Sequence, residues 1–550
     1  MTKPQKLELT WIGKDEQPRL EPRILIEDPE RSYGDKNSGN MLIHGDNLLA
    51  LKALEQDFAG KIKCIYIDPP YNTGNAFEHY DDGVEHSIWL SLIRDRVELL
   101  YRFLSKDGVI FVNIDETEHA YLKVMMDEIF GRANFLGDLI WKKRKGGGND
   151  SRFFAIDHDY ILVYAKNSSK EIHRDKWRVS QTEEYLKRYK EIDEHGNRYY
   201  WDTLARDGLQ NPIVVDIECP DGTTITINSQ KSKQTILEEK ETGDIRFKKV
   251  KNKWTLHHRV YMPKGQVLRS ILDDVGTNKN ANDDLKALFG EDTSFDYPKP
   301  ESLIHRLLEL STNPGDLVLD SFLGSGTTAA VAHKMNRRWI GIELGEHCHT
   351  HCLPRLKKVV DGTDQGGISK AVNWQGGGGF KYYYLAPSLL KEDKYGNWII
   401  DERYNANMLA AAMAKHEGFK YSPDEQIYWK QGKSTEKDYI FTTTKFVTVE
   451  FLDKMHDEMQ PDESLLICCK SFSKACENRY LNITVKKIPK MLLGRCEFGK
   501  EDYSLNIINM PVEENEPDFE PAKKTNGNKK KGKKSAPLKS PVLFSEEDDD

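Results

Sequence analysis

The sequence has no apolar run that approaches the roughly 20 residues needed for a membrane-spanning helix. Its first residues, 1–11, are polar and lack the apolar centre of a secretory signal. With 38% hydrophobic and 31% charged residues, we expect a water-soluble cytoplasmic protein with a substantial core. The length of 550 residues is enough for roughly three or four domains.

Cysteine is sparse, with eight scattered residues, which predicts reduced thiols rather than a disulfide framework. One short segment, 347–352, nevertheless holds three histidines and two cysteines. The pairs His347/His351 and Cys348/Cys352 are each four residues apart, as zinc ligands on a helix would be. Because this segment continues directly as Leu353-Pro354-Arg355-Leu356 after an expected strand, we favour an ordinary surface helix and expect no metal.

An excess of positive charge is also missing, since the formal net charge is −8. This excludes a surface coated with basic side chains, but DNA binding needs only a local basic face. Beyond residue 511 the chain is acidic, carries seven lysines between Lys523 and Lys534, and ends in five acidic residues. Such charge blocks predict a disordered tail. We favour a solubilising role for its lysines over nucleic-acid contact.

Strand patterns alternate with helix patterns through much of the sequence. A short apolar segment at 41–46 precedes a leucine-rich helical segment, and residues 87–104 carry apolar side chains at helical spacing before an apolar run at 109–114. This alternation predicts an α/β domain with a parallel sheet. From about 170 to 290 the charge rises and the periodicity weakens, with short strand-like pieces such as 223–227. We interpret this region as an insertion into the α/β domain.

The changes in pattern divide the chain into six parts. The four glycines at 376–379 mark a second break, after which the sequence is typical of a mixed α+β domain. The predicted parts are an N-terminal arm (1–40), a first half of the α/β domain (41–169), the insertion (170–295), a second half of the α/β domain (296–375), a C-terminal domain (376–510) and the charged tail (511–550).

The segment from Ile65 to Tyr71 is the most informative part of the chain. It reads as a buried strand that ends abruptly in Asp68-Pro69-Pro70-Tyr71. The prolines restrict the backbone, so the Asp68 carboxylate and the Pro69 carbonyl are held at the carboxyl end of a strand, where open α/β sheets bind ligands. Two fixed acceptors beside an aromatic ring can hold a flat ring that bears an amino group. Alone, the segment could also be a chance strand-to-turn junction.

A second segment, 317–343, has the pattern of a nucleotide-binding βαβ unit. A strand ending at Asp320 leads into the loop Phe322-Leu323-Gly324-Ser325-Gly326 and a helix, and a further strand ends at Glu343, 23 positions after Asp320. An acid at this spacing reaches ribose hydroxyls, and glycines allow close approach of the backbone to a ligand. The third glycine of the dinucleotide fingerprint is missing. The loop therefore fits S-adenosylmethionine, which has no phosphate, better than a pyrophosphate cofactor.

The two motifs together resemble amino-group DNA methyltransferases of the permuted type, in which the catalytic motif precedes the cofactor motif. Residues 68–75, Asp-Pro-Pro-Tyr-Asn-Thr-Gly-Asn, and 376–383 are especially similar to modification subunits of type III restriction systems. Further similarities lie at Gly45-Asp46, 140–143, 158–164 and 297–300, and the resemblance covers roughly residues 8–390.

The resemblance implies a Rossmann-like S-adenosylmethionine-dependent fold, with a doubly wound, mostly parallel sheet and the insertion as target recognition domain. The implied activity is methylation of adenine N6 in double-stranded DNA, by a subunit that is typically a dimer and can join a restriction subunit with helicase and nuclease activity. The implied catalytic residues are Asp68, Pro69, Pro70 and Tyr71. The implied cofactor residues are Asp46, Lys299, Asp320, Phe322, Gly324, Gly326, Thr327 and Glu343.

Some assignments keep alternatives. Asn72, Trp141, Phe153 and Phe154 are candidates for contacts to the target base, although core packing is the favoured alternative for each of the three aromatic residues. Asp320 either contacts the cofactor or caps the following loop. The sequence has no Gly-x-x-x-x-Gly-Lys-Ser/Thr loop, so DNA cleavage would need a partner.

Three other functions compete with the favoured one. The first is methylation of cytosine N4 or of RNA adenine; Asp at position 68 favours adenine, and the large insertion favours duplex DNA. The second is an orphan methyltransferase, or a specificity subunit that mainly delivers a nuclease partner. The third, a nucleotide-binding dehydrogenase, does not fit the incomplete glycine fingerprint or explain the Pro-Pro motif.

Overall fold

A computed structural model was obtained for the chain. It describes residues 8–71, 82–146, 153–168, 177–181, 183–205, 208–263, 265–291, 295, 298–434 and 437–503. The predicted tail (511–550) and the motif residues Asn72, Asn75 and Tyr297 lie outside the described residues. Within the described part, no helix is long and apolar enough to cross a membrane.

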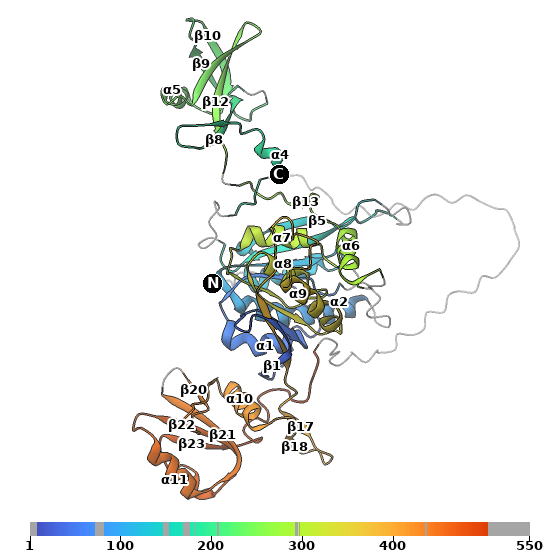
Figure 1. The fold of residues 1–550 in the computed structure, drawn as a ribbon, viewed down its shortest axis with the longest axis vertical. Coiled ribbons are helices and arrows are strands. Elements are labelled where there is room, and N and C mark those ends of the chain that lie inside the picture. The colour runs from blue at the N-terminus through green and yellow to red at the C-terminus, as the bar shows by residue number, and fades with distance from the viewer. Residues whose placement is uncertain are drawn as a thin grey trace, which may run out of the picture. The chain divides into compact units, whose positions relative to one another are not determined.

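The centre of the fold is a ten-stranded, mostly parallel sheet (Figure 1). In spatial order its strands are β1 (Leu25–Gly34), β16 (Gly379–Leu385), β2 (Met41–His44), β15 (Arg338–Glu343), β14 (Leu317–Asp320), β3 (Ile62–Ile67), β4 (Leu104–Ile114), β6 (His158–Ala165), β5 (Phe135–Lys142) and β13 (Ile271–Leu272). Strands β16 to β4 run parallel, whereas β6 is antiparallel to both β4 and β5, and β1 is antiparallel to β16. The predicted fold class is confirmed.

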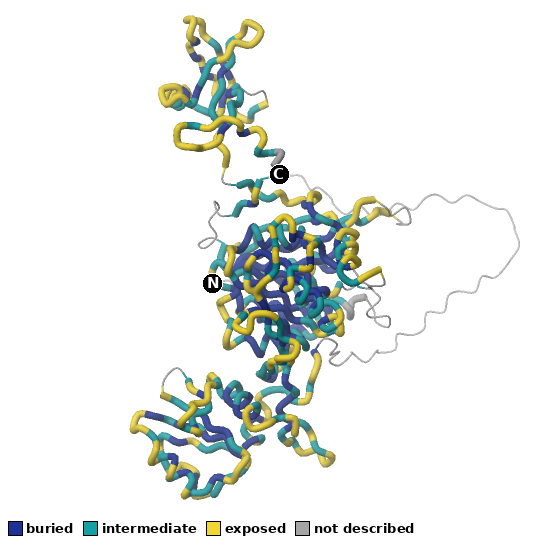
Figure 2. The backbone as a smooth tube through the Cα atoms, in the orientation of Figure 1, coloured by how far each residue is buried: buried dark blue, intermediate teal, exposed yellow. Residues whose placement is uncertain are grey.

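Helices cover both faces of this sheet, which explains why its central strands read as continuous apolar runs. One face packs against α1 (Asn47–Phe58), α2 (Asp82–Phe103) and α3 (His119–Phe130) in one hydrophobic cluster. The other face packs against α7 (Glu301–Ser311), α8 (Thr327–Lys334) and α9 (Leu353–Val360) in a second cluster. Figure 2 shows the buried backbone concentrated in this sheet and its helices.

The strand order places a topological switch point between β14 and β3. From β14 the chain passes through α8 to β15 on one side, whereas from β3 it passes through α2 to β4 on the other. The two connections leave in opposite directions, and open α/β sheets bind their ligands at such a point, outside the carboxyl ends of the strands. The switch point therefore brings Asp320 and Asp68 to the same place, although they are 252 residues apart in the chain.

The sheet extends into parts that the sequence pattern had assigned elsewhere. The expected N-terminal arm (1–40) contains edge strand β1, and the expected C-terminal domain (376–510) begins with β16, which pairs with both β1 and β2. Strand β13 and helix α6 (Asn278–Phe289) lie within the expected insertion (170–295), and β13 pairs with β5. Glycine runs and charge do not reveal strand pairing, which is why these boundaries differ.

The insertion has its own sheets and its own small core. It contains a four-stranded sheet in the order β11 (Ile245–Val250), β12 (Lys253–Tyr261), β8 (Arg198–Thr203) and β7 (Glu191–Ile192). A hairpin of β9 (Ile213–Glu218) and β10 (Thr224–Ser229) accompanies helices α4 (Glu183–Leu186) and α5 (Lys233–Glu241). The expected strand at 223–227 corresponds to β10.

Residues after β16 form two further sheets and two clusters of buried apolar residues. The larger sheet has the order β19 (Lys420–Tyr421), β20 (Gly432–Lys433), β21 (Asp438–Val447), β22 (Ser464–Phe472) and β23 (Ile483–Lys487), with helices α10 (Ala406–His416) and α11 (Val449–Glu458). A hairpin joins β17 (Leu390–Glu392) and β18 (Trp398–Ile400). The predicted mixed α+β character of this region is confirmed.

Candidate active site

The Asp-Pro-Pro-Tyr motif directly follows β3, whose apolar residues are almost all fully buried. Asp68 is partly exposed and Pro69 is buried. The carbonyl of Pro70 accepts a hydrogen bond from the indole Nε1 of the buried Trp89 at 2.8 Å. The motif backbone is therefore fixed from outside as well as by its prolines.

Asp68 has three polar neighbours, each from a different segment. Its Oδ2 accepts from Lys299 Nζ at 2.5 Å, and its Oδ1 lies 3.2 Å from Asn113 Nδ2 and 3.0 Å from the Tyr71 hydroxyl. Asn113 is in place because Ile67 pairs with Val112, so the residues after this pair lie side by side at the sheet edge. The predicted catalytic carboxylate is thus surrounded by donors.

Tyr71 is partly buried, and its ring packs against the same hydrophobic cluster as the ring of Phe322. Its hydroxyl also contacts Asp159 Oδ2 at 3.2 Å and accepts a short hydrogen bond from Asn113 Nδ2. Burial and the two neighbouring carboxylates raise the pKa of Tyr71 well above its ordinary value. The phenol therefore stays neutral and acts as a hydrogen-bond donor.

Asp159 is a site residue to which the sequence reasoning assigned no role. It is 2% exposed and forms an ion pair with Lys143 Nζ at 2.6 Å. Since β6 runs antiparallel to β4 and β5, the beginning of β6 reaches the same sheet edge as Lys143 just after β5. Lys143 and Asp159 lie in the segments 140–143 and 158–164, which resemble the family. Nothing else in the sequence indicated that these two residues belong to the site.

Lys299 was predicted to contact the cofactor, but its ammonium group lies on Asp68. It also lies 5.4 Å from the centre of the Tyr71 ring and 5.9 Å from that of Trp141. The side chain is only 7% exposed. A buried cation thus occupies the space between the catalytic motif and the segment leading into α7.

The glycine loop on the neighbouring strand end is held by Glu343. Glu343 Oε2 accepts from the backbone N–H of Gly324 at 2.7 Å, and Oε1 accepts from that of Gly345 at 2.8 Å. Gly324 has φ +57°, a left-handed conformation that favours glycine. A Cβ at Gly326 would lie 3.3 Å from the Cα of Cys352. The positive φ at Gly324 and the lack of space for a Cβ at Gly326 explain why both positions hold glycine.

Asp320 lies at the end of β14 and is 2% exposed. Its Oδ1 accepts from the backbone N–H of Phe322 at 2.9 Å, so it does cap the loop. Burial, and to a lesser degree the negative charges of Asp68 and Glu343, raise the pKa of Asp320 to about 7. The hydroxyl of the next residue, Ser321, is buried and has no hydrogen-bond partner among the described residues. This edge therefore holds polar groups suited to a ligand.

A buried network of ion pairs packs against the glycine loop 322–326 and the start of α8. Lys334 Nζ lies 2.9 Å from both carboxylate oxygens of Glu301 and 2.8 Å from Asp364. Arg355 bridges Glu301 at 2.9 Å and the hydroxyl of Thr327, also at 2.9 Å. Thr327 itself, a predicted cofactor residue, is buried. The network connects α7, and with it the Lys299 segment, to the glycine loop.

Asp46 was expected to meet an adenine amino group. In the structure it caps α1 by accepting from the backbone N–H of Leu49 at 2.9 Å, and it is 1% exposed. Its Oδ2 accepts from Arg96 at 3.3 Å and from the backbone N–H of Tyr503 at 3.2 Å. Both oxygens are therefore engaged within the protein, so a contact with the cofactor would need one of these bonds to be shared.

The candidate aromatic residues occupy very different environments. Trp141 is fully buried and donates from Nε1 to the carbonyl of Gly276 at 2.9 Å, so its role is packing beside Lys299. Phe153 and Phe154 are 79% and 84% exposed. Asn72 lies outside the described residues. The two phenylalanines are thus the accessible aromatic candidates.

The histidine–cysteine segment belongs to the loop support. Cys348–Cys352 forms a single π-helical turn, η2, in which both cysteines are fully buried, and Cys352 Sγ donates to the carbonyl of Gly324 at 3.0 Å. The segment is helical, as expected, with His347 and Thr350 exposed and its two cysteines packed against the glycine loop. Across the described residues, no three His, Cys, Asp or Glu side chains are arranged to hold a metal ion.

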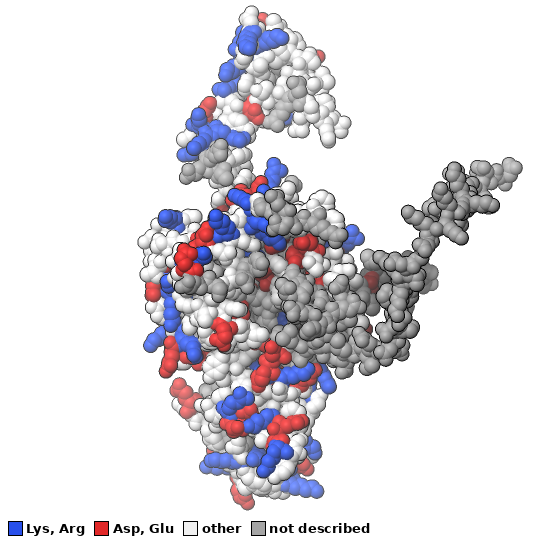
Figure 3. All heavy atoms as spheres, turned by 90° about the vertical axis from the view of Figure 1, so that its right-hand side faces the viewer, with Lys and Arg blue, Asp and Glu red and all other residues white. Residues whose placement is uncertain are grey.

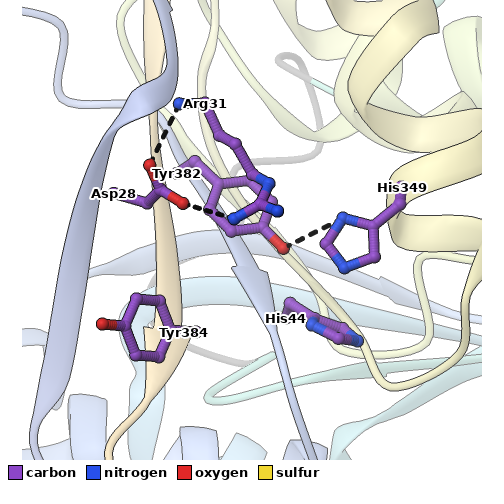
Figure 4. A pocket seen from close by; sticks show the side chains of 6 residues that line it. All are labelled: Asp28, Arg31, His44, His349, Tyr382 and Tyr384. Atoms are coloured by element: carbon purple, nitrogen blue, oxygen red, sulfur yellow. Dashed lines mark hydrogen bonds and ion pairs between the residues drawn. The ribbon is translucent and has the colours of Figure 1, made fainter.

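A separate open pocket of about 440 Å³ lies by β1, β16 and β2 (Figure 4). It is lined by Asp28, Arg31, His44, His349, Tyr382 and Tyr384. Arg31 pairs with Asp28 at 2.5 Å, and the His44 and His349 rings lie 4.5 Å apart. The strand order places β15 and β14 between the strands of this pocket and β3, which leads into the Asp68 motif, while His44 of the pocket pairs with Glu343.

The fold and the polar edge define a doubly wound α/β protein in which the two motifs meet at the switch point. The chain belongs to the N6/N4 DNA methylase family, because a family model described as DNA methylase matches residues 62–352. This is more than half of the chain.

Relatives with described functions are similar over long stretches. The chain is 36% identical over 404 residues to a Haemophilus influenzae protein described as "probable type III restriction-modification enzyme HindVI Mod subunit", a match covering 63% of this chain and 54% of that protein. It is 27% identical over 473 residues to the EcoP15I Mod subunit of Escherichia coli, covering 70% and 72% of the two chains. The chain thus spans about half the length of the first of these relatives.

Among solved structures, one similar chain is the PvuII DNA methyltransferase, described as cytosine-N4-specific. The match has 15% sequence identity and a TM-score of 0.33, and covers 62% of this chain and 95% of the other.

Proposed function

We propose that this chain transfers a methyl group from S-adenosylmethionine to the N6 amino group of adenine in double-stranded DNA. We further propose that it is the modification and sequence-recognition subunit of a type III restriction-modification system. The family match and the names of the Mod relatives support both proposals. A more distant relative, 23% identical over 320 residues, is the DNA adenine methyltransferase YhdJ of Escherichia coli.

The observation that carries the proposal is the meeting of the two motifs at one switch point. Strands β3 and β14 are direct neighbours, with Cys64 paired to Val318 and Ile65 to Leu319. The Asp68 motif and the loop after Asp320 therefore open onto the same edge. Methyl transfer needs this arrangement, because donor and acceptor must lie within bonding distance and in line.

The side chains of the first motif suit a flipped-out base that bears an amino group. Extracting a base from a duplex costs a few kcal/mol, and stacking on Tyr71 would recover roughly 1–3 kcal/mol. The Asp68 carboxylate and the Pro69 carbonyl would each accept one amino hydrogen. This holds the nitrogen lone pair towards the donor. An amino nitrogen that gains a methyl group must lose one proton, and Asp68 would be the adjacent acceptor for it.

The residues at the other strand end fit the cofactor. S-adenosylmethionine supplies a methyl group on a positively charged sulfur. The Glu343 carboxylate, already turned towards the loop, would accept ribose hydroxyls, while Phe322 and the Gly324 backbone would line the methionine part. Ser321, with its buried unpartnered hydroxyl, and Asp320 offer further polar groups. A cofactor contact of Lys299 would require its ammonium group to leave Asp68.

For the insertion and the C-terminal region we propose roles from the resemblance to the family. Residues 170–295 would recognise the DNA target, and residues 376–510 would mediate a dimer or the contact to a restriction subunit with helicase and nuclease activity. The alternatives remain an orphan adenine methyltransferase, a specificity subunit that chiefly delivers a nuclease, and methylation of cytosine N4.

The first test is transfer of radioactive methyl groups to DNA by the full chain. We expect Asp68→Ala to abolish transfer while DNA binding persists, whereas the exposed Asp57→Ala should behave like the wild type. Near-normal transfer by Asp68→Ala would remove Asp68 from the mechanism. Base-resolution mapping of DNA from cells expressing the chain alone would then identify the modified base; methylcytosine would refute the adenine assignment.

A further inference from the structure

The four-stranded sheet of the insertion has one covered face and one open face. Residues opposite each other across paired strands share a face, and side chains alternate along each strand. On the covered face, Leu256 and Phe247 are paired and pack in the insertion's core with the β9–β10 hairpin and α5. The residues of the other face belong to no hydrophobic cluster of the described chain.

The open face combines aromatic and cationic side chains. The strand register sets Trp201 opposite Arg259, Tyr199 opposite Tyr261, and Arg246 opposite His257. Lys248 and Lys253 lie on the same face at neighbouring register positions. We call this set the Arg–Trp face; its members are Tyr199, Trp201, Arg246, Lys248, Lys253, His257, Arg259 and Tyr261.

Two arginines on this face are held by stacking on rings. The guanidinium carbon of Arg246 lies 4.2 Å from the centre of the Trp201 ring, and that of Arg259 lies 4.8 Å from Tyr199 and 5.5 Å from Trp201. Stacking orients the flat guanidinium groups before any ligand arrives, which reduces the entropy lost on binding. Oriented arginines are suited to the paired acceptors of phosphate oxygens and of guanine.

The same face carries unsatisfied polar atoms. Arg246 Nε, Arg259 Nε and His257 Nδ1 are buried and have no hydrogen-bond partner in the described structure. Buried polar atoms are rarely left unpaired in folded proteins. Because these three atoms are themselves buried, a ligand would instead meet the partly exposed outer parts of Arg246 and Arg259.

The charges on and beside the face favour an anionic partner. Four cations, Arg246, Lys248, Lys253 and Arg259, lie near three carboxylates, Asp202, Asp244 and Glu191. Asp244 lies 3.4 Å from Arg259 NH1, and Glu191 accepts from Trp201 Nε1 at 3.0 Å. Burial first, and then the neighbouring cations Arg246 and Lys248, lower the pKa of His257 against an opposing effect of Asp202, so its ring is neutral near pH 7. Figure 3 shows further Lys and Arg side chains on the lobe at the top, which is the insertion.

We infer that the Arg–Trp face is the surface of this chain that binds duplex DNA, with Arg246 and Arg259 as its principal contacts. The Lys248 and Lys253 ammonium groups add phosphate contacts, while the stacked guanidinium groups supply fixed donors. The face itself is argued from its own residues, but its assignment to DNA rather than to another polyanion rests on the proposed function.

The experiment measures binding of a 30-base-pair duplex library of random sequence to the full chain at several salt concentrations. Each lost phosphate contact should lower the slope of log affinity against log salt by about one. We expect Arg246→Ala and Arg259→Ala each to weaken binding on the order of tenfold. Lys233→Ala, on helix α5 of the covered side, removes an equal charge and should stay within about twofold of the wild type. Unchanged binding by both arginine variants would overturn the inference.

Hydrogen exchange on the unmutated protein gives an independent readout that does not depend on a variant folding. DNA should protect peptides containing β8 and β12 and leave β10 unchanged; protection of β10 alone would overturn the inference. Equal, Arg246-dependent binding of heparin would overturn the assignment to DNA. Arg246-dependent DNA binding without any methyl transfer would instead refute the proposed function and leave the Arg–Trp face standing.

Discussion

The Tyr71 hydroxyl lies 3.2 Å from Asp159 Oδ2, although the two residues are 88 positions apart. The hydroxyl has one proton but two carboxylate neighbours, Asp68 and Asp159. If the proton went to Asp68, Asp159 Oδ2 would lose its hydrogen bond from the Tyr71 hydroxyl in a nearly buried position. With the proton on Asp159, Asp68 keeps its bonds from Asn113 and Lys299. We therefore expect Asp159 to draw the phenol proton away from Asp68.

This arrangement makes Asp159 a positioning residue with a testable coupling to Tyr71. We expect Asp159→Ala to lower kcat about tenfold with little change in KM, because Tyr71 would then donate to Asp68. Tyr71→Phe retains the stacking ring and has no proton to donate, so adding Asp159→Ala to it should have a much smaller effect. Strictly additive losses in this double-mutant cycle would contradict the coupling.

The ion pair between Lys299 and Asp68 makes a prediction about stability. Removing one partner of a buried pair leaves an uncompensated charge and typically costs about 3–5 kcal/mol, and less here because the Asp68 side chain is 23% exposed. Asp68→Ala should therefore lower the midpoint of urea unfolding. Adding Lys299→Met, which removes the orphaned cation, should restore part of the loss. A double variant less stable than Asp68→Ala would show that the cation is not the cause.

Asp320 predicts a pH dependence of stability. Its pKa is raised to about 7 in the fold, mainly by burial, against an ordinary value of 3.8. Between these values the folded chain binds a proton that the unfolded chain has lost, so the free energy of unfolding falls as pH rises. The full effect is on the order of 4 kcal/mol at most.

The matching variant is Asp320→Asn, which still offers an oxygen to the Phe322 N–H. We expect it to be more stable than the wild type at pH 8 and similar at pH 4. Urea unfolding at both pH values checks this, with the exposed Asp57→Asn as control. An identical pH profile for Asp320→Asn and wild type would rule out Asp320 as the titrating group.

The buried charges behind the glycine loop predict a large stability loss. Lys334 is 1% exposed and forms ion pairs with Glu301 and Asp364, so Lys334→Met leaves two carboxylates underpaired. We expect a loss of about 3–5 kcal/mol in urea unfolding. The surface pair Lys381–Glu27, 3.3 Å apart, provides the control, since Lys381→Met should change stability by about 1 kcal/mol or less. If Lys334→Met and Lys381→Met lowered the free energy of unfolding equally, burial of the ion pair would not be the cause of the loss.

Glu343 predicts a selective effect on the cofactor. Glu343→Ala removes the acceptor of two backbone N–H groups and the proposed ribose contact, so S-adenosylmethionine should bind at least tenfold more weakly in calorimetry. The preference for the target base should not change, because strand β14 lies between Glu343, on β15, and the Asp68 motif, which follows β3. Unchanged affinity for the cofactor would refute the ribose role.

The sequence alone determined the alternation of strands and helices, the motifs at 65–71 and 317–343, and thereby the class of fold. These features are local: apolar periodicity, prolines and glycines act within a few residues of themselves. The same reasoning misplaced the ends of the main sheet, because β1 and β16 are recognisable only through their pairing with each other and with β2. It expected the surface helix at 347–352, but not that its two cysteines pack against the glycine loop, because that contact joins distant parts of the chain.

Only the tertiary structure decided which groups surround the Asp68 carboxylate, the proposed catalytic group. Lys299 is 231 positions from Asp68, and Asp159 reaches Tyr71 because β6 runs antiparallel at the same edge. Asp46 and Trp141 were plausible ligands from sequence, yet the structure uses one as a helix cap and buries the other. The order and direction of strands bring distant residues together, and no local pattern encodes that order. The chemistry of each side chain was readable from the sequence, but its partners depend on the assembled sheet.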